Sequence, residues 1–137
     1  MAAQPQSLLY EKSYAFAIRL VNAHRFIVES RREFILSKQF LRCGTSIGAN
    51  VAEANGAISK NDFSAKISIA YKECLEVKYW LCLLKDTDYI DQRSFDSMHQ
   101  DADELAKIAY AILKSTRIGK LHFLFLWIKP LFGAWHW

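Results

Sequence analysis

Residues 63–84 read FSAKISIAYKECLEVKYWLCLL and carry an unbroken helical pattern. Apolar side chains recur at alternating spacings of four and three residues, at Phe63, Ile67, Ala70, Cys74, Val77, Leu81 and Leu84. This is the period of a heptad seam, in which one face of a helix packs against nearly antiparallel neighbours. The pattern therefore predicts a long amphipathic helix in an all-α bundle.

Three further helices are predicted, over residues 8–29, 30–55 and 91–116. Residues 8–29 carry apolar side chains on two adjacent faces, whereas the other two segments carry one stripe each. One face is marked by Tyr14, Ile18 and Val21, with Arg25 at its end, and the other by Phe16, Leu20, Ala23 and Ile27. Because the links between the helices are short, the chain is predicted to form an antiparallel, up-and-down four-helix bundle.

Capping patterns predict where these helices begin. Ser30 followed by Glu33 is a capping box, which predicts that the second helix begins at Ser30. Ser59 begins a similar pattern, with Ile58 as a hydrophobic staple against the third helix. Asp91 is the predicted cap of the fourth helix, which is expected to fade near residue 116.

The composition agrees with one helical domain. The chain has 137 residues with only five Gly and two Pro, which argues against a barrel or sandwich built from tight turns. We expect a flexible N-terminus over residues 1–7, the bundle over residues 8–116 and an apolar tail over residues 117–137. Three cysteines without a Cys-x-x-Cys pair, and no secretory signal, predict a reducing, cytoplasmic location.

Small residues at four-residue spacing, Gly44, Gly48 and Ala52, form a ridge that lets a neighbouring helix approach closely. Glycine costs about 1 kcal/mol relative to alanine inside a helix, so two of them need a packing reason. The second helix is predicted to end in a left-handed cap at Gly56.

The first and third helices carry apolar side chains outside their main stripes, and Asn50 is a polar residue among small ones. Both features indicate a subunit interface. The alternative is that the third helix is simply the most central helix of the bundle. The candidate interface residues are Gly44, Gly48, Ala52, Asn50, Tyr79 and Trp80.

The sequence carries no pattern for catalysis, metal or cofactor. A bundle with a two-metal site needs two Glu-x-x-His motifs, and the nearest match is a single Asp96-x-x-His99. Cys43 and Cys74 fall on core stripes, where cysteine is usually a small apolar residue. We therefore predict no catalytic residue, no metal ligand and no cofactor.

Charge is distributed unevenly along the chain, whose net charge is +4. Residues 19–42 hold six cations against two acids, whereas residues 86–104 hold seven acids against one cation. A basic strip of this kind can neutralise phosphates, so we predict a nucleic-acid-binding surface. The strip comprises Arg19, Arg25, Arg31, Arg32, Lys38 and Arg42. The alternatives are a solvated face, or pairing with the acidic segment of a neighbouring subunit.

The C-terminal segment differs from the rest of the chain. Thirteen of residues 118–137 are apolar, but Lys129-Pro130 interrupts them before they reach the roughly 18 residues of a membrane span. Packing on the bundle, or a nonessential extension, is favoured over membrane binding, which remains a weaker alternative.

The run LSKQFLRCGTSIGANVAEA at residues 36–54 resembles the signature of a bacterial four-helix-bundle family, the 23S rRNA intervening sequence proteins. SKNDF at residues 59–63, AKISIA at 65–70, KECLEVKYWL at 72–81 and YID at 89–91 are also similar to that family. The resemblance covers about residues 8–116, and the tail departs from it.

The resemblance implies a left-handed antiparallel bundle that assembles as a homopentamer, without enzymatic activity or cofactor. A related branch serves diversity-generating retroelements as an accessory protein that binds nucleic acid and a reverse transcriptase. The expected function is therefore a non-enzymatic homo-oligomer that binds the RNA or DNA backbone. The alternative is a protein-interaction scaffold, for example one holding a reverse transcriptase.

Overall fold

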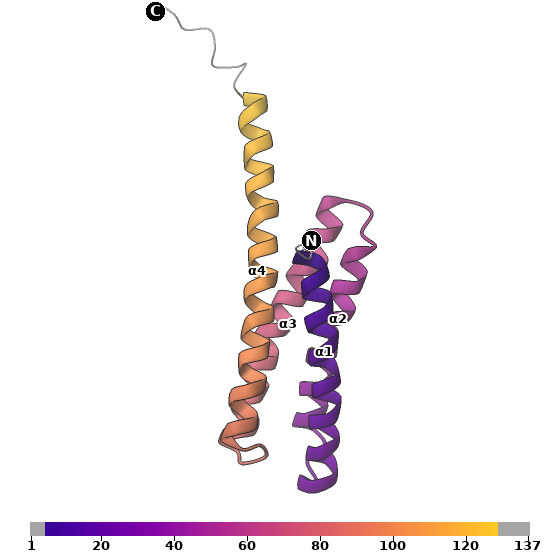
Figure 1. The fold of residues 1–137 in the computed structure, drawn as a ribbon, viewed down its shortest axis with the longest axis vertical. Coiled ribbons are helices and arrows are strands. Elements are labelled where there is room, and N and C mark those ends of the chain that lie inside the picture. Colours follow the sequence, from indigo (N-terminus) through magenta and orange to yellow (C-terminus); the bar gives the residue numbers. More distant parts are fainter. Residues whose placement is uncertain (1–4, 129–137) are drawn as a thin grey trace, which may run out of the picture.

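The computed structural model describes residues 5–128, with the side chains of residues 8–117. Over these residues the chain forms α1 (Pro5–Phe26), α2 (Leu36–Asn55), α3 (Lys60–Asp86) and α4 (Gln92–Ile128), and a π-helical turn, η1 (Ile27–Arg31), extends α1. Each helix packs against the next, and α1 also packs against α4. The α1–α2 and α3–α4 links lie at one end of the molecule and the α2–α3 link at the other (Figure 1). The predicted all-α, up-and-down arrangement of four helices is confirmed.

The predicted core stripes meet in one apolar interior. On α3, every seam position from Ile67 to Leu84 is buried, and Phe63 is partly buried where the seam begins. On α1, the face of Phe16 and Leu20 is turned inward, whereas the Tyr14 face is exposed. Since burying one large apolar side chain contributes about 1.5–3 kcal/mol, these stripes are the main source of stability.

The turn between α1 and α2 differs from its prediction, because α2 does not begin at Ser30. The chain continues as η1 to Arg31, and Arg32 then takes a left-handed conformation with φ 55°. The Glu33 carboxylate accepts hydrogen bonds from the backbone N–H groups of Ile35, Leu36 and Ser37, at 3.0, 2.9 and 2.7 Å. Glu33 therefore caps α2 from outside the helix, instead of reaching back to Ser30.

The caps of α3 and α4 are confirmed. The Ser59 hydroxyl accepts from the backbone N–H of Asp62 at 3.0 Å, and the Asp91 carboxylate accepts from that of Ser94 at 2.7 Å. The staple at Ile58 is wrong, since this side chain is 95% exposed and only its backbone N–H is engaged, by the Asp62 carboxylate.

Two helix ends also differ from prediction. Gly56 has φ −98° and is not left-handed, because its N–H bonds to the Glu53 carbonyl in a tightened last turn. α4 does not fade near residue 116 but runs on to Ile128, where it projects past the other three helices (Figure 1). At the other terminus, α1 begins at Pro5, within the segment predicted to be flexible, because proline suits a first helical turn. Residues 1–4 and 129–137 lie outside the described residues.

None of the helices over residues 5–128 has an apolar stretch long enough to cross a membrane.

The glycines of α2 lie against α1 of the same chain. A Cβ on Gly44 would come within 3.0 Å of Leu20 Cδ1 and closer still to Cδ2, whereas one on Gly48 would stand 3.4 Å from the Ser13 hydroxyl. Ala52 is exposed, so the close approach ends before it. Gly44 is therefore the position where α1 and α2 need a residue without a side chain.

Replacing the two glycines should have opposite effects. We expect Gly44→Ala to lower the free energy of unfolding by about 1–2 kcal/mol, because overpacking against buried Leu20 outweighs the gain in helix propensity. Gly48→Ala is the matched control and should be neutral or stabilising by up to about 1 kcal/mol. Urea denaturation of both variants tests this, and equal effects would contradict the packing argument.

Removing the Glu33 carboxylate should destabilise the protein. Burial raises the pKa of Glu33, but the three N–H bonds and the Ser37 hydroxyl together lower it below its ordinary value of 4.5. We expect Glu33→Ala to cost about 1–2 kcal/mol at pH 7, the range of a lost helix cap. The pKa of Glu33 is lower in the folded state than in the unfolded state, so its stabilising contribution is fully present above the unfolded-state pKa. This contribution is lost as the pH falls through the folded-state pKa.

Urea denaturation from pH 7 to pH 3 measures this difference, with the exposed Glu29→Ala as control. A Glu33→Ala effect that did not shrink in acid would show that the charge of the cap is irrelevant.

Candidate nucleic-acid interface

The structure divides the six residues of the predicted basic strip into two groups. Arg19 and Arg42 are engaged in ion pairs within the chain. The Arg19 guanidinium donates to the Asp101 carboxylate and, at 2.8 Å, to the Ser97 hydroxyl. Arg42 binds α3, with 2.6 Å between its Nη2 atom and Glu76 Oε1. The charges of these two arginines are therefore already balanced.

The other four residues surround the α1–α2 turn, which we call the basic end: Arg25, Arg31, Arg32 and Lys38. All four side chains are exposed, and none forms an ion pair with a carboxylate of the described part of the chain. Arg32 lies over the exposed ring of Phe34, with 5.4 Å between its guanidinium carbon and the ring centroid. These cations come from four successive segments: the last turn of α1, η1, the turn itself and the first turn of α2.

The acids of this turn offset little of that charge. Glu33 is buried, and its carboxylate is occupied by the amides that begin α2. Glu29 is exposed and is the other acid of residues 19–42. The basic end therefore presents a net positive surface to solvent.

Three acidic residues of α4 are paired with cations from their own chain. Asp101 binds Arg19, and Glu104 lies 2.9 Å from the Lys12 ammonium group. Asp103 accepts from Lys107 and Lys78, which lower its pKa to about 2. For Arg19, pairing thus occurs within the subunit, and not with the acidic segment of a neighbour.

Two exposed apolar faces lie on α1 and α3. The α1 face consists of Tyr10, Tyr14, Ile18 and Val21, and the α3 face of Leu75 and Tyr79, with Ile69 about a third of a turn from Leu75 around the helix. α1 and α3 occupy opposite corners of the bundle, because each packs against both α2 and α4. The faces are therefore separate surfaces, and the α3 face includes Tyr79 of the predicted interface.

The remaining predicted interface residues have contacts within the chain. The Asn50 amide donates to the Ser46 carbonyl and hydroxyl oxygens, at 2.8 and 2.9 Å. Trp80 packs partly against the core and donates from Nε1 to Glu76 at 3.2 Å.

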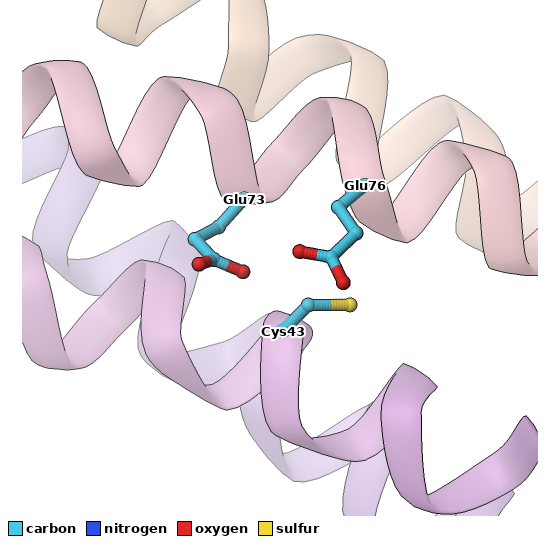
Figure 2. A group of neighbouring side chains, drawn as sticks. All are labelled: Cys43, Glu73 and Glu76. Carbon is cyan, nitrogen blue, oxygen red and sulfur yellow. The ribbon is translucent and has the colours of Figure 1, made fainter.

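One cluster with possible metal-ligand chemistry was missed from the sequence. Glu73 and Glu76 project from α3 toward Cys43 on α2 (Figure 2), and the ligand atoms lie within 4.8 Å of one another. Burial, and then the charge of Glu76, raise the pKa of Glu73. Burial raises the pKa of the Cys43 thiol to about 12, so it is protonated at neutral pH. Arg42, which touches both carboxylates, supplies the positive charge of this cluster.

The sequence signal for this cluster is the spacing of Glu73 and Glu76, which lie one helical turn apart on the helix that packs against α2. Cys74 is buried as well, and burial raises the pKa of its thiol to about 12. Both cysteines therefore behave as small core residues, and neither has the depressed pKa of a reactive thiol.

These features define a four-helix-bundle protein with a basic end. The chain belongs to the 23S rRNA-intervening sequence protein family, which matches residues 6–111. A solved structure of a protein of unknown function from the S23 ribosomal protein family of Bacteroides thetaiotaomicron VPI-5482 is similar, with a TM-score of 0.80 and 44% identity. The similarity covers 81% of this chain and 99% of that chain. Comparison with curated proteins found no match. The resemblance seen in the sequence is confirmed, and the family is one of unknown function with no known catalytic activity.

Arg42 should stabilise the fold through its ion pairs with α3. We expect Arg42→Gln to lower the free energy of unfolding by about 0.5–1 kcal/mol at pH 7, because it leaves two neighbouring carboxylates without their cation. The Glu73 part of this loss should shrink toward pH 4, since burial raises the pKa of Glu73 and this group protonates early. The Glu76 part should persist, because hydrogen bonds from Trp80 and Arg42 outweigh the effect of burial and lower the pKa of Glu76. Thermal denaturation measures the effect, and Arg25→Gln, which breaks no ion pair of the described residues, is the matched control.

Proposed function

We propose that this protein is a non-enzymatic, cytoplasmic homo-oligomer that binds the backbone of RNA or DNA through its basic end. The observation that carries the proposal is the gathering of Arg25, Arg31, Arg32 and Lys38 around one turn, where none of the four forms an ion pair with a carboxylate of the described chain. Arg19 and Arg42 are not part of this surface, because they form ion pairs with acids of α4 and α3.

The chemistry of the basic end suits phosphate. Each cation that neutralises a phosphate releases a condensed counterion, so the affinity depends steeply on salt. Three of the four residues are arginines, whose planar guanidinium groups bind phosphate oxygens in a bidentate manner. Backbone contacts of this kind position the nucleic acid without reading its sequence.

The two exposed apolar faces support an oligomer, and we propose the pentamer implied by the family resemblance. The faces lie on opposite corners and differ in composition, so contact between the α1 face of one copy and the α3 face of the next is heterologous. Heterologous contacts close into rings when the rotation between copies permits. A ring would present several basic ends and raise the overall affinity for one long nucleic acid.

The same apolar faces favour a second candidate function, a scaffold for a protein partner such as a reverse transcriptase. Exposed apolar patches of this kind mark protein interaction sites. In that case the basic end is a solvated surface, and binding to nucleic acid is weak at all salt concentrations.

Neutralising the basic end should separate these functions. We expect the triple variant Arg25→Gln, Arg31→Gln, Arg32→Gln to bind structured RNA and duplex DNA at least about tenfold more weakly, with the salt slope reduced by roughly 2–3. The matched control is Lys60→Gln, Lys72→Gln, Lys114→Gln, which removes the same charge from exposed positions outside the basic end.

Fluorescence anisotropy across a salt series measures the affinities, and sedimentation of the same samples gives the oligomeric mass. Equal losses in both triple variants would show that only net charge matters. No binding by the unaltered protein at low salt would favour the protein scaffold.

A further inference from the structure

A cleft of about 400 Å³ opens beside the basic end, between the C-terminal part of α1 and the α3–α4 link. The two links that flank it lie at the same end of the molecule (Figure 1). Its lining includes Asn22, Ala23, Phe26, Arg31, Tyr89 and Asp91. Its volume lies in the range of about 300–1,000 Å³ that is typical of sites for small organic groups.

The walls of the cleft combine aromatic and polar groups. Phe26 comes from α1 and is 52% exposed, and Tyr89 comes from the α3–α4 link and is half-buried. The Asn22 amide is exposed and makes no side-chain hydrogen bond within the described part of the chain. The cleft therefore offers aromatic surface together with an unused hydrogen-bond donor and acceptor.

The charged groups at the cleft differ in their availability. Arg19, which also lines it, is held by Asp101 and Ser97. Asp91 is occupied as the cap of α4; the hydrogen bonds from Ser94 are the main cause of its lowered pKa, and the nearby charge of Arg31 adds to it. Arg31 is the member of the basic end that lines the cleft, so phosphate binding and the cleft share one residue.

We propose that this cleft receives one unpaired base of a single-stranded RNA or DNA segment whose phosphates lie on the basic end. The base stacks on Phe26 and meets Tyr89 and the Asn22 amide, while Arg31 holds the adjoining phosphate. This inference rests on the proposed function and adds to it the class of nucleic acid, which is unpaired.

The preference for an unpaired base follows from stacking. Aromatic side chains bind bases of single strands by stacking, and polar side chains bind the exposed base edges. In a duplex the same faces and edges are occupied, and turning a base out costs a few kcal/mol. The cleft should therefore strengthen binding to a single strand and contribute nothing to binding of a blunt duplex.

Two phenylalanines provide a matched test. Phe26 and Phe34 are 52% and 50% exposed and both lie near the basic end, but only Phe26 lines the cleft. With the full chain, a 12-nucleotide single strand and a blunt duplex of the same sequence, we expect Phe26→Ala to weaken single-strand binding about tenfold, the effect of one lost stacking contact. Duplex binding should change less than twofold, and Phe34→Ala, which removes the ring beneath Arg32, should affect both probes alike.

Asn22→Ala is a second variant at an exposed position and should weaken single-strand binding about threefold, in the range of one hydrogen bond. Thermal denaturation confirms that each variant is folded. A Phe26→Ala loss that is the same for the single strand and the duplex, as is expected for Phe34→Ala, would overturn the proposal.

The same measurements distinguish failure of the cleft from failure of nucleic-acid binding by the basic end. If the unaltered protein binds both probes with a steep salt slope and Phe26→Ala has no effect, the cleft assignment is wrong and the basic end stands. If the unaltered protein binds neither probe at low salt, both proposals fail.

Discussion

The buried carboxylate of Glu33 holds the turn that carries the basic end of the molecule. By accepting three backbone N–H bonds it starts α2 and leaves the preceding residues to form a π-helical turn and a left-handed step at Arg32. A left-handed conformation costs a non-glycine residue about 1–2 kcal/mol, which the cap offsets. The same carboxylate is thereby buried as an acceptor, so Glu33 does little to oppose the charge of Arg31 and Arg32.

Charge in this bundle is organised by helix contacts more than by segments of the sequence. Three acidic residues of α4 form ion pairs with cations of α1 and α3, and Glu73 and Glu76 of α3 form ion pairs with Arg42 of α2. These pairs lie along the sides of the bundle, where helices run beside each other. At the α1–α2 turn four exposed cations gather without an ion pair to the described part of the chain, and for that reason they remain available to an external anion.

The basic end, the cleft and the exposed apolar faces belong to different parts of one small bundle. The cations and the cleft share the end that carries the α1–α2 and α3–α4 links, whereas the apolar faces run along α1 and α3. Association through the faces would leave the end free. Membership of the 23S rRNA-intervening sequence protein family accounts for the fold, and the family's function is unknown, so a functional interpretation has to come from these surfaces.

Much of the fold could be predicted because its signals are local. The seam of α3 and the caps at Ser59 and Asp91 follow from spacings of three or four residues, which helix geometry converts directly into a buried face or a hydrogen bond. The start of α2 could not be predicted in this way, because the pattern of Ser30 and Glu33 suits a capping box as well as the observed forward cap.

The candidate site could be predicted only in part from the sequence, because part of it depends on contacts between distant residues. The cluster of cations between residues 19 and 42 is plain in the composition, but which of them are free depends on partners far along the chain. Asp101 is 82 residues from Arg19, and Glu76 is 34 residues from Arg42. The sequence by itself determined the helices, their inward faces and the presence of a basic segment, since these depend on local periodicity. Only the tertiary structure decided which charges are neutralised and where a cleft opens, because both depend on how distant helices are rotated and placed against one another.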